Sequence, residues 1–496
     1  MNIKLTLISL MTLVGLCASA INVTSTPGNL ASIVAENVDE TTLVISGEIN
    51  AADIEFIANK MTSLTTLDLS EATIVAYSGS SILLGGTEYN SNTIPAYALA
   101  GSSINAIILP QNLQTIDEGA LSSTKIKSIN IPATVTKIGV GAFANCDELI
   151  SINIPATVAI LGSHAFSDCD NLNIVELGIQ QLNASTFARC KSLNNVTATS
   201  LISIGESAFS NCTALESINF PSSLTTIGAS AFQGSGLKTI DFANTSSLDS
   251  IGAWAFAQCK SLTTAIMNNN TSKIGEGAFF EDTSLVTFNM PLACTTLPNY
   301  IFKGNNNMDT TYAINHNVTN IGAYALMDWI HVTSFTLPNS LEYIGDNAFE
   351  GWTSLKQLNA EGIINEVPEL GENVWNEVSQ DSVYLNVAAD MAEAFLAADQ
   401  WKNFKINGVS SVENIIDNDV ESRIFAYFDG FDLVIKSYCD ICQVNLYDSS
   451  ARQYATKRPN NNTIVINTSD WNSRFYIVKA LLADGTIAVI KVARQN

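Results

Sequence analysis

Few side chains in this sequence are of the types that catalyse reactions or bind metals. Its 496 residues include only 3 histidines, His164, His316 and His331, and 9 cysteines. The local motif with chemical precedent is Cys439-x-x-Cys442. A structural zinc site needs about four ligands, and no others lie at a suitable spacing nearby. A redox pair normally begins a helix in an α/β domain, whereas this pair lies between segments that we expect to be strands. We therefore expect a local disulfide or two packed thiols.

Other catalytic signatures are missing from the sequence. It contains no His-Glu-x-x-His helix motif, no phosphate-binding loop and no nucleophile elbow. Neighbouring carboxylates, such as Asp53 with Glu55 and Glu281 with Asp282, are what an acidic surface supplies by chance. We expect a protein that is not an enzyme, with no catalytic residue, no cofactor and no metal.

The remaining cysteines point to packing instead of chemistry. Five of them lie three residues after a Phe, and these are Cys146, Cys169, Cys190, Cys212 and Cys259. Residues at one position of a repeat stack into a column, and a small, weakly polar side chain suits an internal turn. We expect a ladder of buried free thiols, with isolated disulfides as the alternative in an exported protein. Cys294 falls outside this column.

The elements that hold these residues recur along the chain. The phrase Ile-Gly-x-x-Ala-Phe has clear copies at Ile138, Ile204, Ile227 and Ile344. Degenerate copies begin at Ile94, Ile116, Leu161, Leu182, Ile251, Ile274, Leu297 and Ile321, and successive copies lie 21 to 24 residues apart. A period of about 20–29 residues is typical of a leucine-rich-repeat solenoid, and solenoids usually act as binding surfaces. The expected fold is a β-rich α/β repeat.

One repeat shows how each position is used. In the copy after Phe209 we expect a strand from Leu215 to Phe220, ended by Pro221 because proline cannot donate to a strand ladder. Gly228 then permits a tight corner or a close approach that a larger residue would block. Alternate residues of such strands face outward.

Two columns of outward-facing residues follow from this alternation. The first is Ser128, Ser151, Ile174, Asn195, Ser217, Thr239, Thr264, Thr287, Thr310, Ser334 and Gln357. The second is Asn130, Asn153, Glu176, Thr197, Asn219, Asp241, Ile266, Asn289, Tyr312, Thr336 and Asn359. The columns are either a solvated β-face or a polar platform for a protein or glycan. For the whole face we expect binding, with Ser217, Asn219, Thr239, Asp241, Thr264, Thr287, Asn289, Thr310 and Tyr312 as candidate partner-binding residues.

The N-terminal segments suggest export and capping. Residues 1–20 resemble a cleavable signal peptide, with Lys4, an apolar stretch and Ala18-Ser19-Ala20. Residues 21–92 are expected to form an N-terminal cap and first repeat, including a helix from Ala51 to Lys60, because exposed repeat ends need caps. Residues 93–378 are then the repeats of about 23 residues.

The repeats are followed by three further expected parts. Residues 379–408 are expected to be a C-terminal cap with a helix at 388–401, and 409–420 a linker. Residues 421–496 are expected to form a small β-sandwich, a possible sorting or attachment module. Its hairpins are marked by Asp429-Gly430 and Asp484-Gly485 between apolar runs.

The charge of the chain restricts its partners. Its 47 acidic and 23 basic residues give a formal net charge of −24. Nucleic acid and anionic membrane surfaces are disfavoured because both need clustered Lys and Arg. After the signal peptide no stretch reaches the ~18 apolar residues that a membrane-spanning helix needs.

The repeat resembles a known family. The sequence from Ala142 to Gly162, Ala-Phe-x-Asn-Cys-x-x-Leu-x-x-Ile-x-Ile-Pro-x-x-Val-x-x-Leu-Gly, resembles the BspA-like leucine-rich repeats, over roughly residues 40 to 405. Members are typically secreted or surface proteins of bacteria, and some are implicated in adhesion. The segments at 474–479 and 490–493 resemble C-terminal sorting or attachment modules, from which Cys439-x-x-Cys442 and Asn461-Asn462 depart.

This resemblance implies a secreted or cell-surface protein that is not an enzyme. We expect adhesion to a surface or extracellular-matrix protein of a host or neighbouring cell. The alternatives are a glycan-binding protein, for which Trp329 and Trp352 would be the aromatic platforms, and a structural component of the cell's own surface.

Overall fold

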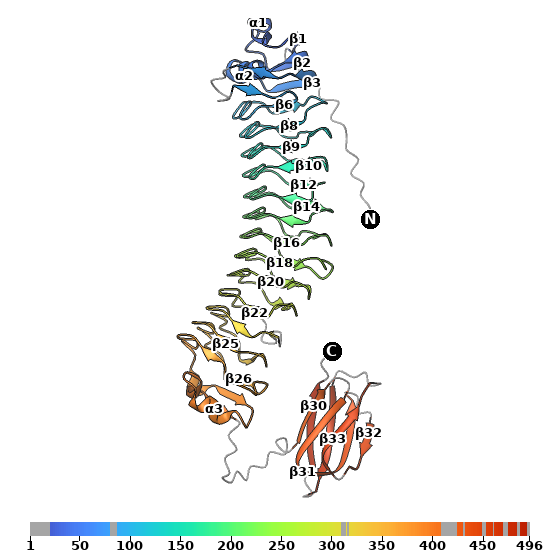
Figure 1. The fold of residues 1–496 in the computed structure, drawn as a ribbon, viewed down its shortest axis with the longest axis vertical. Coiled ribbons are helices and arrows are strands. Elements are labelled where there is room, and N and C mark those ends of the chain that lie inside the picture. The colour runs from blue at the N-terminus through green and yellow to red at the C-terminus, as the bar shows by residue number, and fades with distance from the viewer. Residues whose placement is uncertain are drawn as a thin grey trace. The chain divides into compact units, whose positions relative to one another are not determined.

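The computed structural model of the chain describes residues 20–79, 87–308, 314, 317–407, 424–429, 432–448, 453–459, 461–469, 475–483 and 487–493. The chain divides into two compact units, Met1–Ser410 and Ser411–Asn496. The first unit is a solenoid whose coils are stacked one on another, and the second is an antiparallel sheet (Figure 1).

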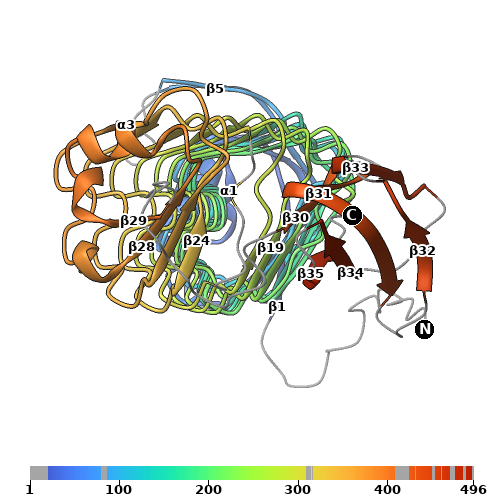
Figure 2. The same cartoon turned by 90° about the horizontal axis from the view of Figure 1, so that it is seen from below.

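The coils of the solenoid, seen along the stack in Figure 2, contribute strands to two sets of parallel sheets. The first set consists of strands of two to four residues: β7 (Ala106–Ile108), β10 (Ser151–Ile154), β12 (Ile174–Leu177), β14 (Asn195–Ala198), β17 (Thr239–Asp241), β19 (Thr264–Ile266), β21 (Thr287–Phe288), β24 (Ser334–Thr336) and β26 (Gln357–Ala360). The pairing of Ser151 with Ile174, and of Thr239 with Thr264, matches the predicted columns.

The second set consists of two-residue strands that end at the Ile or Leu of each repeat phrase. They are β6 (Thr93–Ile94), β8 (Thr115–Ile116), β9 (Lys137–Ile138), β11 (Ile160–Leu161), β13 (Gln181–Leu182), β15 (Ser203–Ile204), β16 (Thr226–Ile227), β18 (Ser250–Ile251), β20 (Lys273–Ile274), β22 (Thr296–Leu297), β23 (Asn320–Ile321), β25 (Tyr343–Ile344) and β27 (Glu369–Leu370). Turns connect the two sets, so the repeats in the described residues carry no helix.

The core of the solenoid is a continuous stack of aromatic rings. Phe143, Phe166, Phe187, Phe209 and Phe232 are fully buried, and adjacent rings lie 5.0 to 5.6 Å apart and nearly parallel. The stack continues through Phe256 and Phe279 to Phe302. Because one repeat cannot bury its own apolar face, the coils hold each other in place through this stack.

The repeated glycine allows neighbouring coils to approach closely. A Cβ atom built on Gly228 would lie 2.7 Å from the backbone carbonyl carbon of Gly205, the equivalent residue of the preceding coil. The close approach expected at this position is therefore confirmed.

The N-terminal cap is a parallel sheet with two helices. It contains β1 (Ala20–Ser25), β2 (Thr42–Ile49) and β3 (Thr66–Ile74), with α1 (Leu30–Ile33) and α2 (Ala51–Lys60). The helix expected from Ala51 to Lys60 has these bounds. β4 (Tyr77–Ser78) and β5 (Glu88–Tyr89) pair beside the cap.

One predicted strand is wrong. Residues 215–220 carry no strand, and this gap separates the sheet β10-β12-β14 from the sheet β17-β19-β21. Phe220 and Phe242 occupy the position that Ile154 holds in β10, and their rings lie 4.7 Å apart at 46°. Phe220 also meets the Phe232 ring edge-on at 5.8 Å, so tilted ring contacts accompany the missing strand.

The C-terminal cap contains η1 (Gln380–Ser382), β28 (Tyr384–Val387), α3 (Ala392–Ala397), η2 (Trp401–Asn403) and β29 (Lys405–Asn407). The helix predicted over 388–401 is therefore shorter than expected. It ends at Ala397, because Ala398 has an extended backbone and Gln400 adopts a φ of +59°. The predicted linker at 409–420 lies outside the described residues.

The second unit is built around one long strand. β31 (Asp432–Asp448) pairs through its first half with β30 (Ile424–Asp429) and β33 (Asn461–Asn467). Its second half pairs with β32 (Gln453–Lys457) and β34 (Phe475–Leu482), and β34 pairs with β35 (Ile487–Ala493). Side chains of both halves enclose a single core of their own. Both predicted hairpins are present as strand pairs, whereas Gly430 and the Asp484-Gly485 turn lie outside the described residues.

Candidate functional site

The predicted binding face, here called the strand face, is exposed over β17 to β21. Its members there are Thr239, Asp241, Thr264, Thr287 and Asn289, and all are exposed except Thr264, which is half-buried. Thr239, Thr264 and Thr287 are direct partners across the parallel pairing. The side chains therefore form a continuous row of hydroxyl groups along three coils.

Two members of the strand face also support the local backbone. The Asn289 amide accepts a hydrogen bond from the Met267 N–H at 2.7 Å and donates to the Met267 carbonyl at 3.0 Å. The Asp241 carboxylate accepts from the Ala243 N–H at 2.8 Å. These two residues have a structural task even without a partner.

The other predicted members are less regular. Ser217 and Asn219 are exposed, but they lie in the gap between the sheets and on no strand. Thr310 and Tyr312 lie outside the described residues. The structure thus brings together the five members from Thr239 to Asn289 and places Ser217 and Asn219 on irregular backbone.

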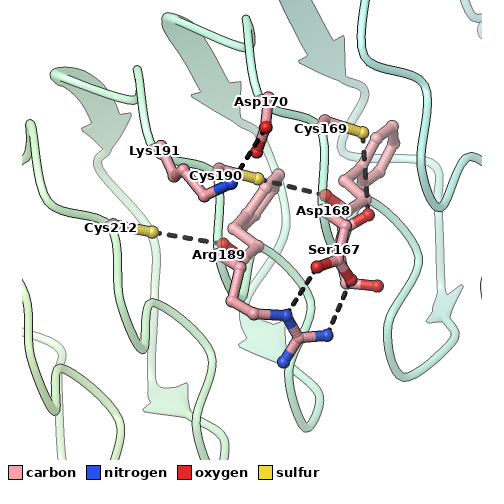
Figure 3. Close-up of polar contacts among 10 residues, drawn as sticks. Ser167, Asp168, Cys169, Asp170, Arg189, Cys190, Lys191 and Cys212 are labelled. Atoms are coloured by element: carbon pink, nitrogen blue, oxygen red, sulfur yellow. Dashed lines mark hydrogen bonds and ion pairs between the residues drawn. The ribbon is translucent and has the colours of Figure 1, made fainter.

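The cysteine column, three residues after each core Phe, is a ladder of hydrogen-bonded thiols (Figure 3). Cys146, Cys169, Cys190, Cys212 and Cys259 are buried and free. The Cys190 thiol donates to the Phe166 carbonyl and the Cys212 thiol to the Phe187 carbonyl, both at 3.1 Å. Each thiol therefore joins its coil to the one before it, as the free-thiol prediction requires.

Trp329 and Trp352 belong to this same column, and the prediction that they form glycan platforms is wrong. Both are buried, with their rings 5.8 Å apart and inclined by 4°. The Trp329 indole donates to the Phe302 carbonyl at 3.1 Å, the bond that a thiol makes in earlier coils. Neither ring face is free for a sugar.

Asp282 and Asn305 fill two further positions of the column. Asp282 is fully buried, and its Oδ1 accepts from the Cys259 N–H at 2.7 Å, while Asn305 Oδ1 accepts from the Asp282 N–H at 2.9 Å. Burial raises the pKa of the Asp282 carboxyl well above its usual range. Asp53 is also buried and caps α2. The prediction that these carboxylates lie on the surface by chance is therefore wrong for Asp53 and Asp282.

Ion pairs connect coils at the surface beside the thiols. Arg189 contacts both carboxylate oxygens of Asp168, at 2.5 and 2.6 Å, and Lys191 Nζ lies 3.0 Å from Asp170 Oδ2 (Figure 3). The Arg189 guanidinium lowers the pKa of the Asp168 carboxyl. Each charged group pairs with a group of opposite charge in the neighbouring coil. This arrangement is the one expected of residues that stabilise the stack.

A second column, here called the turn column, was missed by the sequence reasoning. It is the third residue after each phrase-initial Ile or Leu, and every described member has a left-handed backbone with φ between 52° and 59°. The members are Tyr97, Gly119, Gly141, His164, Ser185, Ser207, Ser230, Trp254, Gly277, Tyr300, Tyr324, Asn347 and Asn373. This conformation costs about 1–2 kcal/mol for a residue other than glycine. The signal in the sequence was the recurrence of Gly, Ser and Asn at this position.

The Cys439-x-x-Cys442 segment lies inside β31, so the prediction that it lies between strands is wrong. The pairing register of β31 shifts between Lys436 and Ile441, and a shift of this kind bends a strand without ending it. Cys442 carries a free, half-buried thiol, and the side chain of Cys439 lies outside the description.

Neither metal-binding nor membrane-spanning features were found where the structure is described. No group of three or more His, Cys, Asp or Glu side chains there is arranged to hold a metal ion. No helix among those residues is both long and apolar enough to span a membrane.

Comparison with known structures supports the solenoid fold. A leucine-rich repeat protein from Bacteroides ovatus is 23% identical, with a TM-score of 0.57 over 74% of this chain and 87% of its own. A leucine-rich cell surface protein from Faecalibacterium prausnitzii is 22% identical, with a TM-score of 0.32 over 50% of this chain and 82% of its own. No curated protein matches the sequence.

The family model of the BspA type leucine-rich repeat region matches residues 92–202, 180–309 and 310–418. These ranges contain the repeat phrases, the Phe stack and the cysteine column described above. The matched segments together span more than half of the chain. The chain therefore belongs to the BspA type leucine-rich repeat family.

Proposed function

We propose that this protein is a secreted or cell-surface protein, not an enzyme, that binds a protein of a host or neighbouring cell. The observation that carries the proposal is the strand face over β17 to β21. There Thr239, Thr264 and Thr287 form a row of short hydrogen-bonding side chains on a rigid scaffold. Many small contacts over a broad face suit recognition of another protein, and solenoids commonly bind in this way.

Two further features support an exported, non-catalytic role. The N-terminal segment has the composition of a signal peptide, so the mature chain would begin at Ile21. The buried thiols of the cysteine column and Asp282 make hydrogen bonds between neighbouring coils. Mass spectrometry of the protein recovered from outside the producing cells would test cleavage after Ala20.

The binding experiment uses the chain from Ile21 to Asn496 to capture partners from solubilised extracellular matrix and cell-surface extracts. The test variant carries Thr239→Arg, Thr264→Arg and Thr287→Arg, which place bulky charges along the face. The matched control carries Lys125→Glu and Lys127→Glu, which change charge in an earlier coil. We expect a saturable partner that the control retains and the test variant loses. Retention of the partner by both variants would exclude this face.

A further inference from the structure

Apart from one intervening glycine, three successive members of the turn column are aromatic. The left-handed backbone at this position disfavours aromatic residues. Trp254, Tyr300 and Tyr324 have φ values of 57° to 58° and are half-buried. Elsewhere Gly, Ser or Asn usually fills this position, since bulky residues adopt a left-handed backbone at a cost. Because these three rings are only half-buried, the packing energy that they gain compensates for only part of that cost.

The aromatic residues form one continuous strip across four coils. The Trp254 and Tyr300 ring centroids lie 6.2 Å apart, and Tyr300 stacks on Tyr324 at 4.9 Å and 5°. Gly277 lies between the first two, and a Cβ there would come within 2.4 Å of the Trp254 ring. Because Gly277 has no side chain, the Trp254 indole can extend across the coil that contains Gly277. Phe280 meets the indole edge-on at 5.2 Å, so the aromatic strip comprises Trp254, Phe280, Tyr300 and Tyr324.

The surroundings of the aromatic strip are acidic. Asp328 lies near Lys303, and Glu350 lies near Asp328. Glu276 and Asp346 are exposed, and their backbone carbonyls accept from the N–H groups of Trp254 and Tyr324, so each lies in the coil that follows a strip residue. The Asp346 carboxylate also accepts a hydrogen bond from the Glu372 N–H, at 2.8 Å. In the part of the chain that the structure describes, neither carboxylate is in an ion pair.

A cation already lies against this strip. Lys303 Nζ is 5.3 Å from the Tyr324 ring centroid and 5.8 Å from that of Tyr300. Both distances fall within the ~6 Å range of cation–π contacts. The ring faces therefore already hold one positive side chain, which a basic segment of a partner would displace or join.

We propose that the aromatic strip binds a Lys- or Arg-rich segment of a partner protein. The rings would contact the aliphatic stems and charged heads of the basic side chains, while Glu276 and Asp346 would pair with their charges. Trp and Tyr are the residues that most often dominate protein interfaces. A neutral glycan would stack on the rings but leave the carboxylate surplus unused. The inference rests on the proposed function in that the partner is a protein, but it uses the turn column and not the strand face.

The test measures calorimetric binding of a ten-residue peptide of alternating Arg and Ser to the chain from Ile21 to Asn496. The test variant carries Trp254→Ser, Tyr300→Ser and Tyr324→Ser, because Ser207 and Ser230 occupy the same left-handed position in other coils. The control is Tyr97→Ser, which removes an exposed aromatic of the same column far along the stack. We expect saturable binding that the triple variant weakens at least tenfold and the control leaves unchanged.

A peptide of alternating Glu and Ser and a neutral oligosaccharide serve as comparison ligands. Equal binding of the Arg peptide by the triple variant and the parent chain would overturn the proposal, as would failure of that peptide to bind. Binding of the oligosaccharide alone would replace it with glycan recognition. Loss of extract partners on the strand-face substitutions, without any binding of the Arg peptide, would leave the proposed function intact and overturn only this inference.

Discussion

The position three residues after each core Phe accommodates a thiol, a hydroxyl, a carboxyl, an amide and an indole. The thiol and indole members share a geometric task, since each donates a hydrogen bond to a carbonyl of the preceding coil: Cys212 to Phe187, and Trp352 to Leu326. Such a bond contributes about 0.5–1.5 kcal/mol net, and an unpaired buried carbonyl costs more. Hydrogen-bonding capacity and space, not chemical reactivity, explain why cysteine recurs here.

Asp282 gives this column a dependence on pH. Its folded-state pKa is raised by burial, whereas in the unfolded chain an Asp has a pKa of about 3.9. Between these two values the folded state binds the extra proton, so the free energy of unfolding falls as the pH rises. The groups facing it add no compensating charge: the neighbouring Cys259 thiol also has a raised pKa, and Asn305 is neutral.

We therefore expect Asp282→Asn to raise the melting temperature at pH 8 more than at pH 4. Each unit of pKa difference between the two states corresponds to about 1.4 kcal/mol at a pH above both values. Asn fits because Asn305 occupies the next position of the column in the same manner. Thermal unfolding followed by circular dichroism at both pH values measures the effect, with Glu281→Gln as control. An equal change at both pH values would show that Asp282 is ionised in the folded protein.

Within the repeat, two positions are occupied by glycine for different physical reasons. Gly228 lies where the backbones of adjacent coils meet, and its hypothetical Cβ lies 2.7 Å from the Gly205 carbonyl carbon. Gly141 has a φ of +58°, but the atom nearest to its hypothetical Cβ would be the Ala144 Cβ, at 3.7 Å. The first position excludes any side chain, whereas the second requires only a left-handed backbone.

Gly228→Ala should therefore destabilise the solenoid by more than about 1–3 kcal/mol, the usual cost of overpacking, because backbone atoms must move. Gly141→Asn should change the stability by less than about 1 kcal/mol, since asparagine tolerates the left-handed region. Urea unfolding of both variants against the parent chain provides the comparison. Similar small losses from both substitutions would indicate that neighbouring coils can move apart to accept a methyl group at position 228.

The repeat phrase was sufficient to predict the solenoid, the thiol ladder and the pairing of Thr239 with Thr264, because each depends on one side chain recurring at a fixed period. Features set by contacts between unlike residues were not predictable. The break in the sheet at residues 215–220 occurs where the Phe220 and Phe242 rings meet at a tilt. The burial of Trp329 follows from its place in the cysteine column. The left-handed turn column was hidden because Trp254 and Tyr300 break its pattern of small residues.

The whole molecule combines two different ways of burying apolar surface. In the solenoid each coil contacts its neighbours, so stability accumulates along the stack. In the second unit, strands distant in sequence enclose one small core that includes Leu433, Leu446 and Val478. The two cores share no residue. The two units are therefore expected to respond separately to changes in their cores.

We expect Phe209→Ala and Leu446→Ala to act on different unfolding transitions of the intact chain. Phe209 is fully buried between Phe187 and Phe232, and its loss should cost about 3–5 kcal/mol. Leu446 is fully buried in the second core, where its loss should cost about 2–5 kcal/mol. Hydrogen exchange read by mass spectrometry in increasing urea follows each unit by its own peptides. Phe209→Ala should lower the midpoint only for peptides of the solenoid, and Leu446→Ala only for those of the second unit. If either substitution shifted both midpoints equally, the chain would unfold as one cooperative body, because separate cores transmit a local loss only when the units are energetically coupled.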